Sequence, residues 1–171
     1  LHGARDLRLE PRAARALGPH DVRLRLGAGG ICGSDLHYYQ HGRVGAFVIR
    51  EPLVPGHEAS GVVDAVGAEV SRVKVGDRVA IDPSHPCGQC DYCLAGDQPL
   101  CPDFGILGEH RPGTLAEYVV VPARSLVRKP EAMSWHEAAA LPLTTLTAWR
   151  MLVTRAGLRP GETVLIWGIG G

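Results

Sequence analysis

Four of the five cysteines in this chain lie within one short segment, CGQCDYCLAGDQPLC. Their spacing is C-x2-C-x2-C-x7-C, and they are Cys87, Cys90, Cys93 and Cys101. Four thiolates on one loop can surround a Zn²⁺ ion with bonds of about 2.3 Å. The alternative is a group of reduced or disulfide-bonded cysteines. Because four cysteines complete a tetrahedron and leave no open position for a substrate, the pattern predicts a structural zinc site.

The fifth cysteine, Cys32, stands alone in the segment GGICGSDLHYY. A single cysteine is commonly a buried core thiol. A second segment, PGHE, offers His57 and Glu58. Cysteine, histidine and a carboxylate from separate loops are typical ligands of a catalytic zinc ion, which keeps one position open for water or substrate. His57 could equally be a core histidine, so the residue types alone leave both interpretations open.

The last residues, TVLIWGIGG, pair an apolar run with a cluster of glycines. The run at 163–167 is typical of a buried parallel strand. Gly168, Gly170 and Gly171 then match the beginning of a G-x-G-x-x-G turn that binds the pyrophosphate of a dinucleotide. A glycine-rich tail without a ligand is the alternative.

Composition excludes several classes of partner. The 171 residues include 18 Lys plus Arg and 18 Asp plus Glu, so the formal net charge is zero. With no basic run, we expect neither a nucleic-acid nor an anionic-membrane partner. The chain contains no apolar run of about 18 residues and no signal-peptide pattern at its start. A cytoplasmic setting is therefore expected, where clustered cysteines hold metal more often than they form disulfides.

The chemistry-bearing segments are separated by short apolar or alternating runs with glycine and proline between them. This pattern is typical of a β-rich barrel or sandwich, with strands expected at 21–26, 61–66, 78–81 and 117–121.

A different pattern begins near residue 130. Ser134 and Glu137 form a capping box, so a long helix should follow and end before Gly157. Pro142 inside this helix predicts a kink or a later start.

Together these segments resemble the medium-chain zinc-dependent alcohol and polyol dehydrogenases. The matching stretches cover essentially the whole chain in the family's order: GGICGSDLH, PGHEASGVV, VKVGDRVAI, the four-cysteine lobe, GTLAEYVVVP and GETVLIWGIGG. The resemblance implies an α+β fold. Residues 1–150 would form a β-rich GroES-like catalytic barrel with the zinc lobe at 87–101, and residues 151–171 would contain the first strand of a truncated Rossmann domain.

The resemblance also implies two zinc ions, one catalytic and one structural. Cys32 and His57 would bind the catalytic ion, and Glu58 lies where the polyol branch uses a glutamate ligand. The cofactor would be NAD or NADP in the full-length protein, with Thr147 near the nicotinamide. Thr147 could also be a core-facing helix residue.

Three further residues would move protons or hold the ligands. Ser34 would take the proton of the substrate hydroxyl, and His37 would pass it towards solvent, although His37 could also be an ordinary surface histidine. Asp35 would accept a hydrogen bond from a zinc-bound histidine and fix its tautomer.

The implied reaction is oxidation of an alcohol or polyol by hydride transfer to NAD(P), in an enzyme that forms homo-oligomers when full length. The stretch SDLHYYQHGRVGAF is most similar to L-idonate 5-dehydrogenase and sorbitol dehydrogenase, whereas EAAALPLTTLTAWRML is more like the simple zinc alcohol dehydrogenases. We expect the 171 residues alone to be inactive. Two alternatives remain: a zinc-independent quinone or enoyl reductase of the same fold, and a non-enzymatic zinc-stabilised module.

Overall fold

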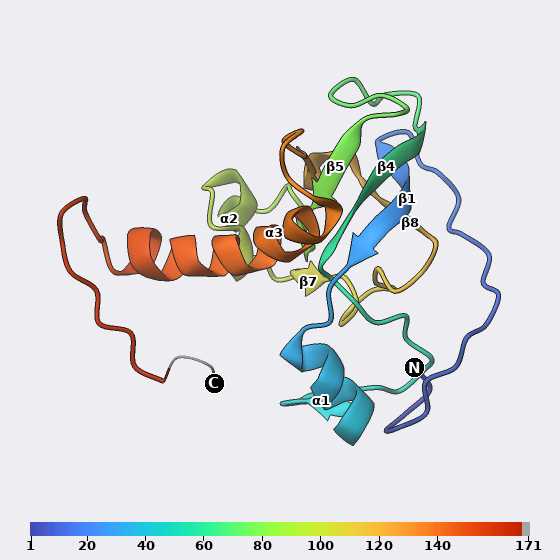
Figure 1. The fold of residues 1–171 in the computed structure, drawn as a ribbon, viewed down its shortest axis with the longest axis horizontal. Coiled ribbons are helices and arrows are strands. Elements are labelled where there is room, and N and C mark those ends of the chain that lie inside the picture. Colours follow the sequence, from blue (N-terminus) through green and yellow to red (C-terminus); the bar gives the residue numbers. More distant parts are fainter. Residues whose placement is uncertain (169–171) are drawn as a thin grey trace.

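The computed structural model describes residues 1–168 and is built around one antiparallel sheet (Figure 1). The strand order is β8-β1-β4-β5-β9, formed by β8 (Tyr118–Pro122), β1 (Asp21–Gly29), β4 (Ala59–Val66), β5 (Arg78–Ile81) and β9 (Leu126–Arg128). The four expected strands all occur, within a few residues of their expected ends. The curled antiparallel sheet agrees with the β-rich barrel that the sequence predicts.

The alternation of side chains along the strands explains the core. Val22 and Leu24 of β1 are fully buried, whereas Arg23 and Arg25, which alternate with them, are exposed. Successive strand residues point to opposite faces, so one face of β1 is apolar and buried and the other is exposed to solvent. The buried face packs against Val63, Val79, Ile81, Val119, Val121 and Leu126 from the other four strands.

Short elements extend from the sheet. Helix α1 (Gly33–His41) follows β1 and packs beside the hairpin of β2 (Arg43–Val44) and β3 (Phe47–Val48). The hairpin of β6 (Ser84–His85) and β7 (Gly105–Ile106) encloses α2 (Asp91–Leu94) and the 3₁₀ turn η1 (Gln98–Leu100). A second 3₁₀ turn, η2 (Ala123–Ser125), joins β8 to β9.

Helix α3 (Trp135–Trp149) begins at the predicted capping box and extends away from the sheet (Figure 1). The Ser134 Oγ accepts a hydrogen bond from the Glu137 N–H at 3.2 Å, and the Glu137 Oε2 accepts one from the Ser134 N–H at 2.8 Å. The helix includes Pro142, so the later start that proline suggested is not found. It continues as the π-helix η3 (Arg150–Arg155) and ends before Gly157, as expected.

The beginning of α3 is fastened to the sheet at Trp135. The Ser60 Oγ donates to the Trp135 carbonyl at 2.7 Å. The Arg78 guanidinium and the Lys129 ammonium lie 5.5 and 5.2 Å from the centre of the Trp135 ring. Cations at this distance are attracted to the face of an indole. The helix is therefore anchored at its first turn, where β1, β4 and β5 lie beneath it.

The end of the described chain differs from expectation. Residues 163–167 form no strand, and the side chains of Leu165 and Trp167 are 85% and 92% exposed. A strand needs a neighbour for its backbone N–H and C=O groups, and no described strand lies beside this segment. Gly168 adopts a φ of 75°, while Gly170 and Gly171 of the predicted phosphate turn lie outside the described residues. None of the described helices is long and apolar enough to cross a bilayer.

The capping box gives a stability prediction. Replacing Ser134 with alanine removes the oxygen that accepts from Glu137, and the loss of such a cap costs about 1 kcal/mol. We expect S134A to lower the free energy of unfolding in urea by that amount. The control is S71A, at an exposed serine outside any helix, which should change it by less than about 0.5 kcal/mol. Equal stabilities for S134A and S71A would contradict the prediction.

Candidate metal centres

The register of two strands brings the catalytic ligand candidates together. In the β1–β4 pair, Gly29 lies opposite Ala59, and the Gly30 N–H donates to the Glu58 carbonyl at 2.8 Å. Cys32 follows the end of β1 and caps α1, while His57 and Glu58 directly precede β4. Ligand atoms of all three residues lie within 4.8 Å of one another. The sequence prediction that Cys32, His57 and Glu58 form one cluster therefore agrees with the geometry.

His57 has an arrangement that a core histidine would not have. Its side chain is only 1% exposed, and both Nδ1 and Nε2 lack a hydrogen-bond partner among residues 1–168. Burying a polar atom without a partner is costly. A cation held between His57, the Cys32 thiolate and the Glu58 carboxylate would remove that cost. The donor set of one nitrogen, one sulfur and one oxygen fits a zinc ion.

Asp35 does not do what the sequence suggested. It is 6% exposed, and its Oδ2 accepts from the Cys32 N–H at 2.9 Å while its Oδ1 accepts from the Gly56 N–H at 3.0 Å. No hydrogen bond joins His57 to Asp35, and both carboxylate oxygens accept from backbone amides instead. Asp35 instead joins the two segments that carry Cys32 and His57, so it positions both ligands through the main chain.

The main chain next to His57 is packed closely at three glycines, Gly56, Gly108 and Gly113. Gly56 has a φ of 92°, and a Cβ there would lie 2.8 Å from the Leu115 Cγ. A Cβ at Gly108 or at Gly113 would overlap the Gly56 backbone. The Thr114 N–H donates to the Gly56 carbonyl at 2.9 Å. Two loops, the one before β4 and the one between β7 and β8, thus meet main chain to main chain beside His57. No local pattern predicts this contact, because Gly56 is about fifty residues away from Gly108 and Gly113 along the chain.

The side chains predicted to move protons lie on α1. Ser34 has a buried Oγ with no hydrogen-bond partner in the described chain. His37 lies one turn later and is exposed. Thr147 on α3 is also exposed.

Sequence reasoning missed two hydroxyls, those of Tyr38 and Thr114. Each residue is 2% exposed, and each hydroxyl is buried without a partner. Tyr38 is on α1, and Thr114 adjoins Gly56. Threonine and tyrosine are too common in cores for their sequence positions to have revealed this.

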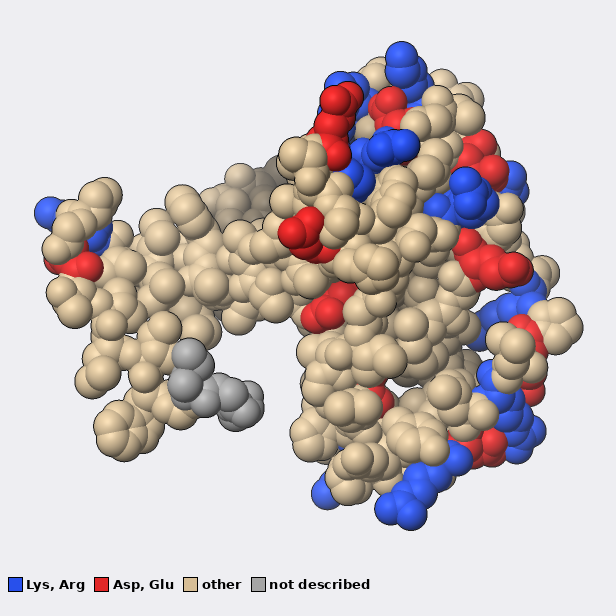
Figure 2. Space-filling view, viewed as in Figure 1, with Lys and Arg blue, Asp and Glu red and all other residues tan. Residues whose placement is uncertain are grey.

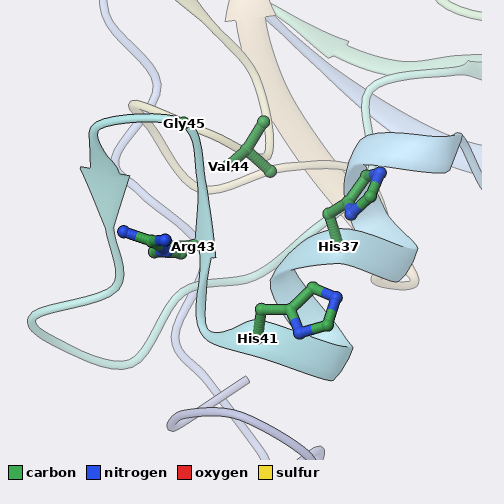
Figure 3. A pocket seen from close by; sticks show the side chains of 5 residues that line it. All are labelled: His37, His41, Arg43, Val44 and Gly45. Carbon is green, nitrogen blue, oxygen red and sulfur yellow. The ribbon is translucent and has the colours of Figure 1, made fainter.

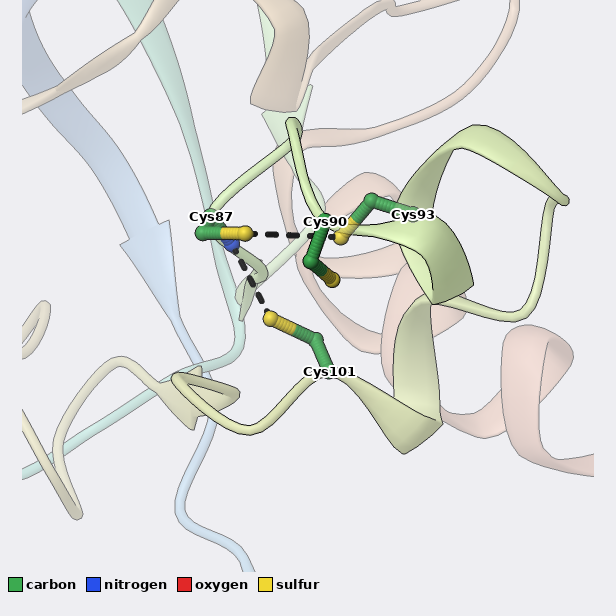
Figure 4. A group of neighbouring side chains, drawn as sticks. All are labelled: Cys87, Cys90, Cys93 and Cys101. Atoms are coloured by element: carbon green, nitrogen blue, oxygen red, sulfur yellow. Dashed lines mark hydrogen bonds between the residues drawn. The ribbon is translucent and has the colours of Figure 1, made fainter.

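The four cysteines converge as predicted (Figure 4). Their sulfur atoms lie within 4.8 Å of one another. The β6–β7 hairpin pairs His85 with Gly105 and closes the lobe at its base. Main-chain N–H groups also point at the sulfurs: Cys87 N donates to the Cys101 Sγ and Gly88 N to the Cys93 Sγ, both at 3.3 Å. Amides directed at sulfur are suited to thiolates, and four thiolates at this spacing fit a zinc ion.

The cysteines differ in acidity before any ion binds. Backbone N–H groups of Gln89 and Cys90 donate to the Cys87 sulfur and lower its pKa to about 6. Burial raises the pKa of Cys93 to about 12. Cys87 is thus ionised at neutral pH, whereas Cys93 would lose its proton only when a metal ion binds the sulfur and displaces it.

Comparison with known proteins agrees with this geometry. The family described as the alcohol dehydrogenase GroES-like domain matches residues 18–131. The chain belongs to this family. D-xylulose reductase A of Aspergillus niger is 39% identical over 99% of this chain and 48% of its own length. A probable D-xylulose reductase A of Aspergillus clavatus is 40% identical with the same coverage.

Solved structures show the same family fold. An NAD-dependent alcohol dehydrogenase is 44% identical, with a TM-score of 0.85 over 95% of this chain and 47% of its own. A cobalt- and zinc-bound thermostable alcohol dehydrogenase from Pyrobaculum aerophilum is 33% identical, with a TM-score of 0.79 over 95% of this chain and 48% of its own. The chain thus spans about half the length of the relatives that it matches.

The four-cysteine lobe predicts a defined metal content. We expect the purified protein to bind about two zinc ions per chain, one in each cluster. Replacing Cys93 with serine should remove one ion and destabilise the protein, because structural zinc binding is coupled to folding. Elemental analysis and thermal unfolding measure both effects. A folded wild-type sample without zinc would refute the prediction.

The lack of a side chain at Gly30 leaves room for the Glu58 carboxylate. A Cβ at Gly30 would overlap the Glu58 carboxylate. Gly30→Ala should therefore displace Glu58 and weaken zinc binding at Cys32 and His57 by about tenfold or more, while the four-cysteine ion stays. The control is Gly33→Ala, at the first residue of α1 three positions further on, where a Cβ meets nothing within 4 Å. Competition with a chelator gives both affinities. If the two variants bind zinc equally well, Gly30 does not position Glu58.

Proposed function

We propose that this chain is the catalytic half of a zinc-dependent dehydrogenase, which oxidises a secondary alcohol of a polyol by hydride transfer to NAD or NADP. The observation that carries the proposal is the buried His57, with two unpartnered ring nitrogens beside Cys32 and Glu58. The Cys32 thiolate, the His57 imidazole and the Glu58 carboxylate would hold the catalytic zinc. A zinc ion there supplies Lewis-acid polarisation of the substrate oxygen.

The chain's own residues would handle the substrate proton. Ser34 presents a buried hydroxyl two residues after Cys32, and its Oγ has both a proton to give and lone pairs to accept one. His37 lies three residues beyond Ser34, so the two side chains are neighbours on the surface of α1. Since His37 is exposed, it can exchange the proton with water. Asp35 keeps this helix start in place through the Cys32 and Gly56 amides.

The substrate class follows from the site and the relatives. A site with one bound cation and the Ser34 hydroxyl nearby would suit a neutral molecule that carries hydroxyl groups. Relatives 39–40% identical are called D-xylulose reductases, which supports a polyol and its ketose as the substrate pair. Lys, Arg, Asp and Glu side chains are intermixed on the face drawn in Figure 2, which favours a small-molecule substrate over a nucleic acid or a membrane.

The second half of the enzyme would bind the cofactor. Thr147 on the exposed part of α3 would lie near the nicotinamide, and Gly168, Gly170 and Gly171 would begin the phosphate-binding turn. Several apolar side chains of α3 and the segment after it are exposed, among them Leu146, Trp149 and Trp167, as expected of a surface on which a nucleotide-binding domain packs. A full-length homo-oligomer and a cytoplasmic location belong to the same proposal.

Removing one ligand tests the proposal. In a chain of the relatives' full length, Cys32→Ala should abolish oxidation of a polyol with NAD or NADP and release one of two zinc ions. The control S71A should keep both activity and zinc. Absorbance of the reduced cofactor at saturating polyol measures turnover, and elemental analysis measures zinc. Full turnover by Cys32→Ala would overturn the proposal and favour a zinc-independent reductase.

A further inference from the structure

Two histidines on α1 form a pair that the reaction above does not explain. His37 and His41 are separated by four residues, so they lie on the same face of the helix. Their ring centroids are 5.8 Å apart, with the planes tilted by 33°. Both side chains are exposed. Figure 3 shows the two rings one above the other, on the same side of α1.

The separation of the rings is close to that of two imidazoles on one metal ion. Zn–N bonds of about 2.0–2.1 Å at a tetrahedral ion place two bound imidazole centroids about 5 Å apart. The observed 5.8 Å needs only a small side-chain rotation to reach this value. Two histidines at i and i+4 on a helix are a known ligand arrangement for divalent ions.

The surroundings of the pair suit a cation. The rings border a cavity of about 410 Å³, whose other lining residues are Arg43, Val44 and Gly45. This volume has room for an ion and its water ligands. In Figure 3 the Arg43 side chain extends to the opposite side of β2 from the histidines, so its charge does not occupy the space between the rings. His41 is also the last residue of α1, where the helix dipole favours positive charge.

We propose that His37 and His41 form a third metal site, which takes a divalent transition ion that prefers imidazole, such as Zn²⁺, Ni²⁺ or Cu²⁺. The site is distinct from both clusters described above, because it shares no residue with them. A bound ion would occupy the ring nitrogen that His37 needs to exchange a proton with solvent. The consequence, which rests on the proposed function, is that excess zinc inhibits the enzyme by capturing His37.

The test uses the full-length protein with its two tight zinc sites already filled. Isothermal titration with ZnCl₂ should detect one additional ion per chain. His41→Ala should lose that ion but keep the first two, because one imidazole lacks the gain in effective concentration that a second linked ligand provides. His136→Ala, at an exposed histidine in the first turn of α3, is the matched control and should bind three. No additional ion in the wild type, or the same third ion in His41→Ala, would overturn the site.

Turnover provides the second measurement. Added ZnCl₂ should inhibit the wild type and His136→Ala alike, whereas His41→Ala should need at least about tenfold more zinc for the same inhibition. Equal inhibition of all three proteins would overturn the regulatory role. The ion count does not depend on activity, so a protein that binds the third ion but oxidises no polyol would contradict the proposed function and leave the metal site standing.

Discussion

Strands β1 and β4 remain paired up to Gly29 and Ala59, and the hydrogen bond from the Gly30 N–H to the Glu58 carbonyl extends the pairing one step further. This register decides which loops meet. A shift of one residue would turn the core side chains of β1 to solvent and move Cys32 away from His57. The core thus holds the ligands in place: Val22, Leu24 and Val63 fix the strands, and the strands fix the loops at their ends.

Contacts made by Asp35 and Gly30 position the three candidate ligands, Cys32, His57 and Glu58. Asp35 accepts from both the Cys32 and the Gly56 amides, and this joins the loop before α1 to the loop before β4. Glu58 occupies space that only a glycine at position 30 leaves free. The cluster therefore depends on the lack of a side chain at Gly30 as well as on the side chains of Cys32, His57 and Glu58.

Local signals in the sequence were sufficient for much of this structure. The capping box placed the start of α3 correctly, because a cap involves four consecutive residues. The cysteine spacing predicted the lobe, because the four cysteines are close together along the chain and need no distant segment to meet. The strands followed from alternation. By contrast, the partner of Asp35 and the meeting of Gly56, Gly108 and Gly113 depend on segments distant along the chain, so no local pattern could reveal them. The apolar run at 163–167 reads as a strand, but a strand exists only beside a neighbour.

The hydrogen bonds behind His57 have a consequence for dynamics. The amides of Gly113, Thr114 and Leu115 donate to the carbonyls of Val54, Gly56 and Pro55, in a region where Gly113 and Thr114 are buried. Such amides exchange with solvent only when the structure around them opens. We therefore expect the main chain around His57 to open only when both loops and the first residues of β4 open together. A group that binds His57 would then be held by a backbone that moves as one unit.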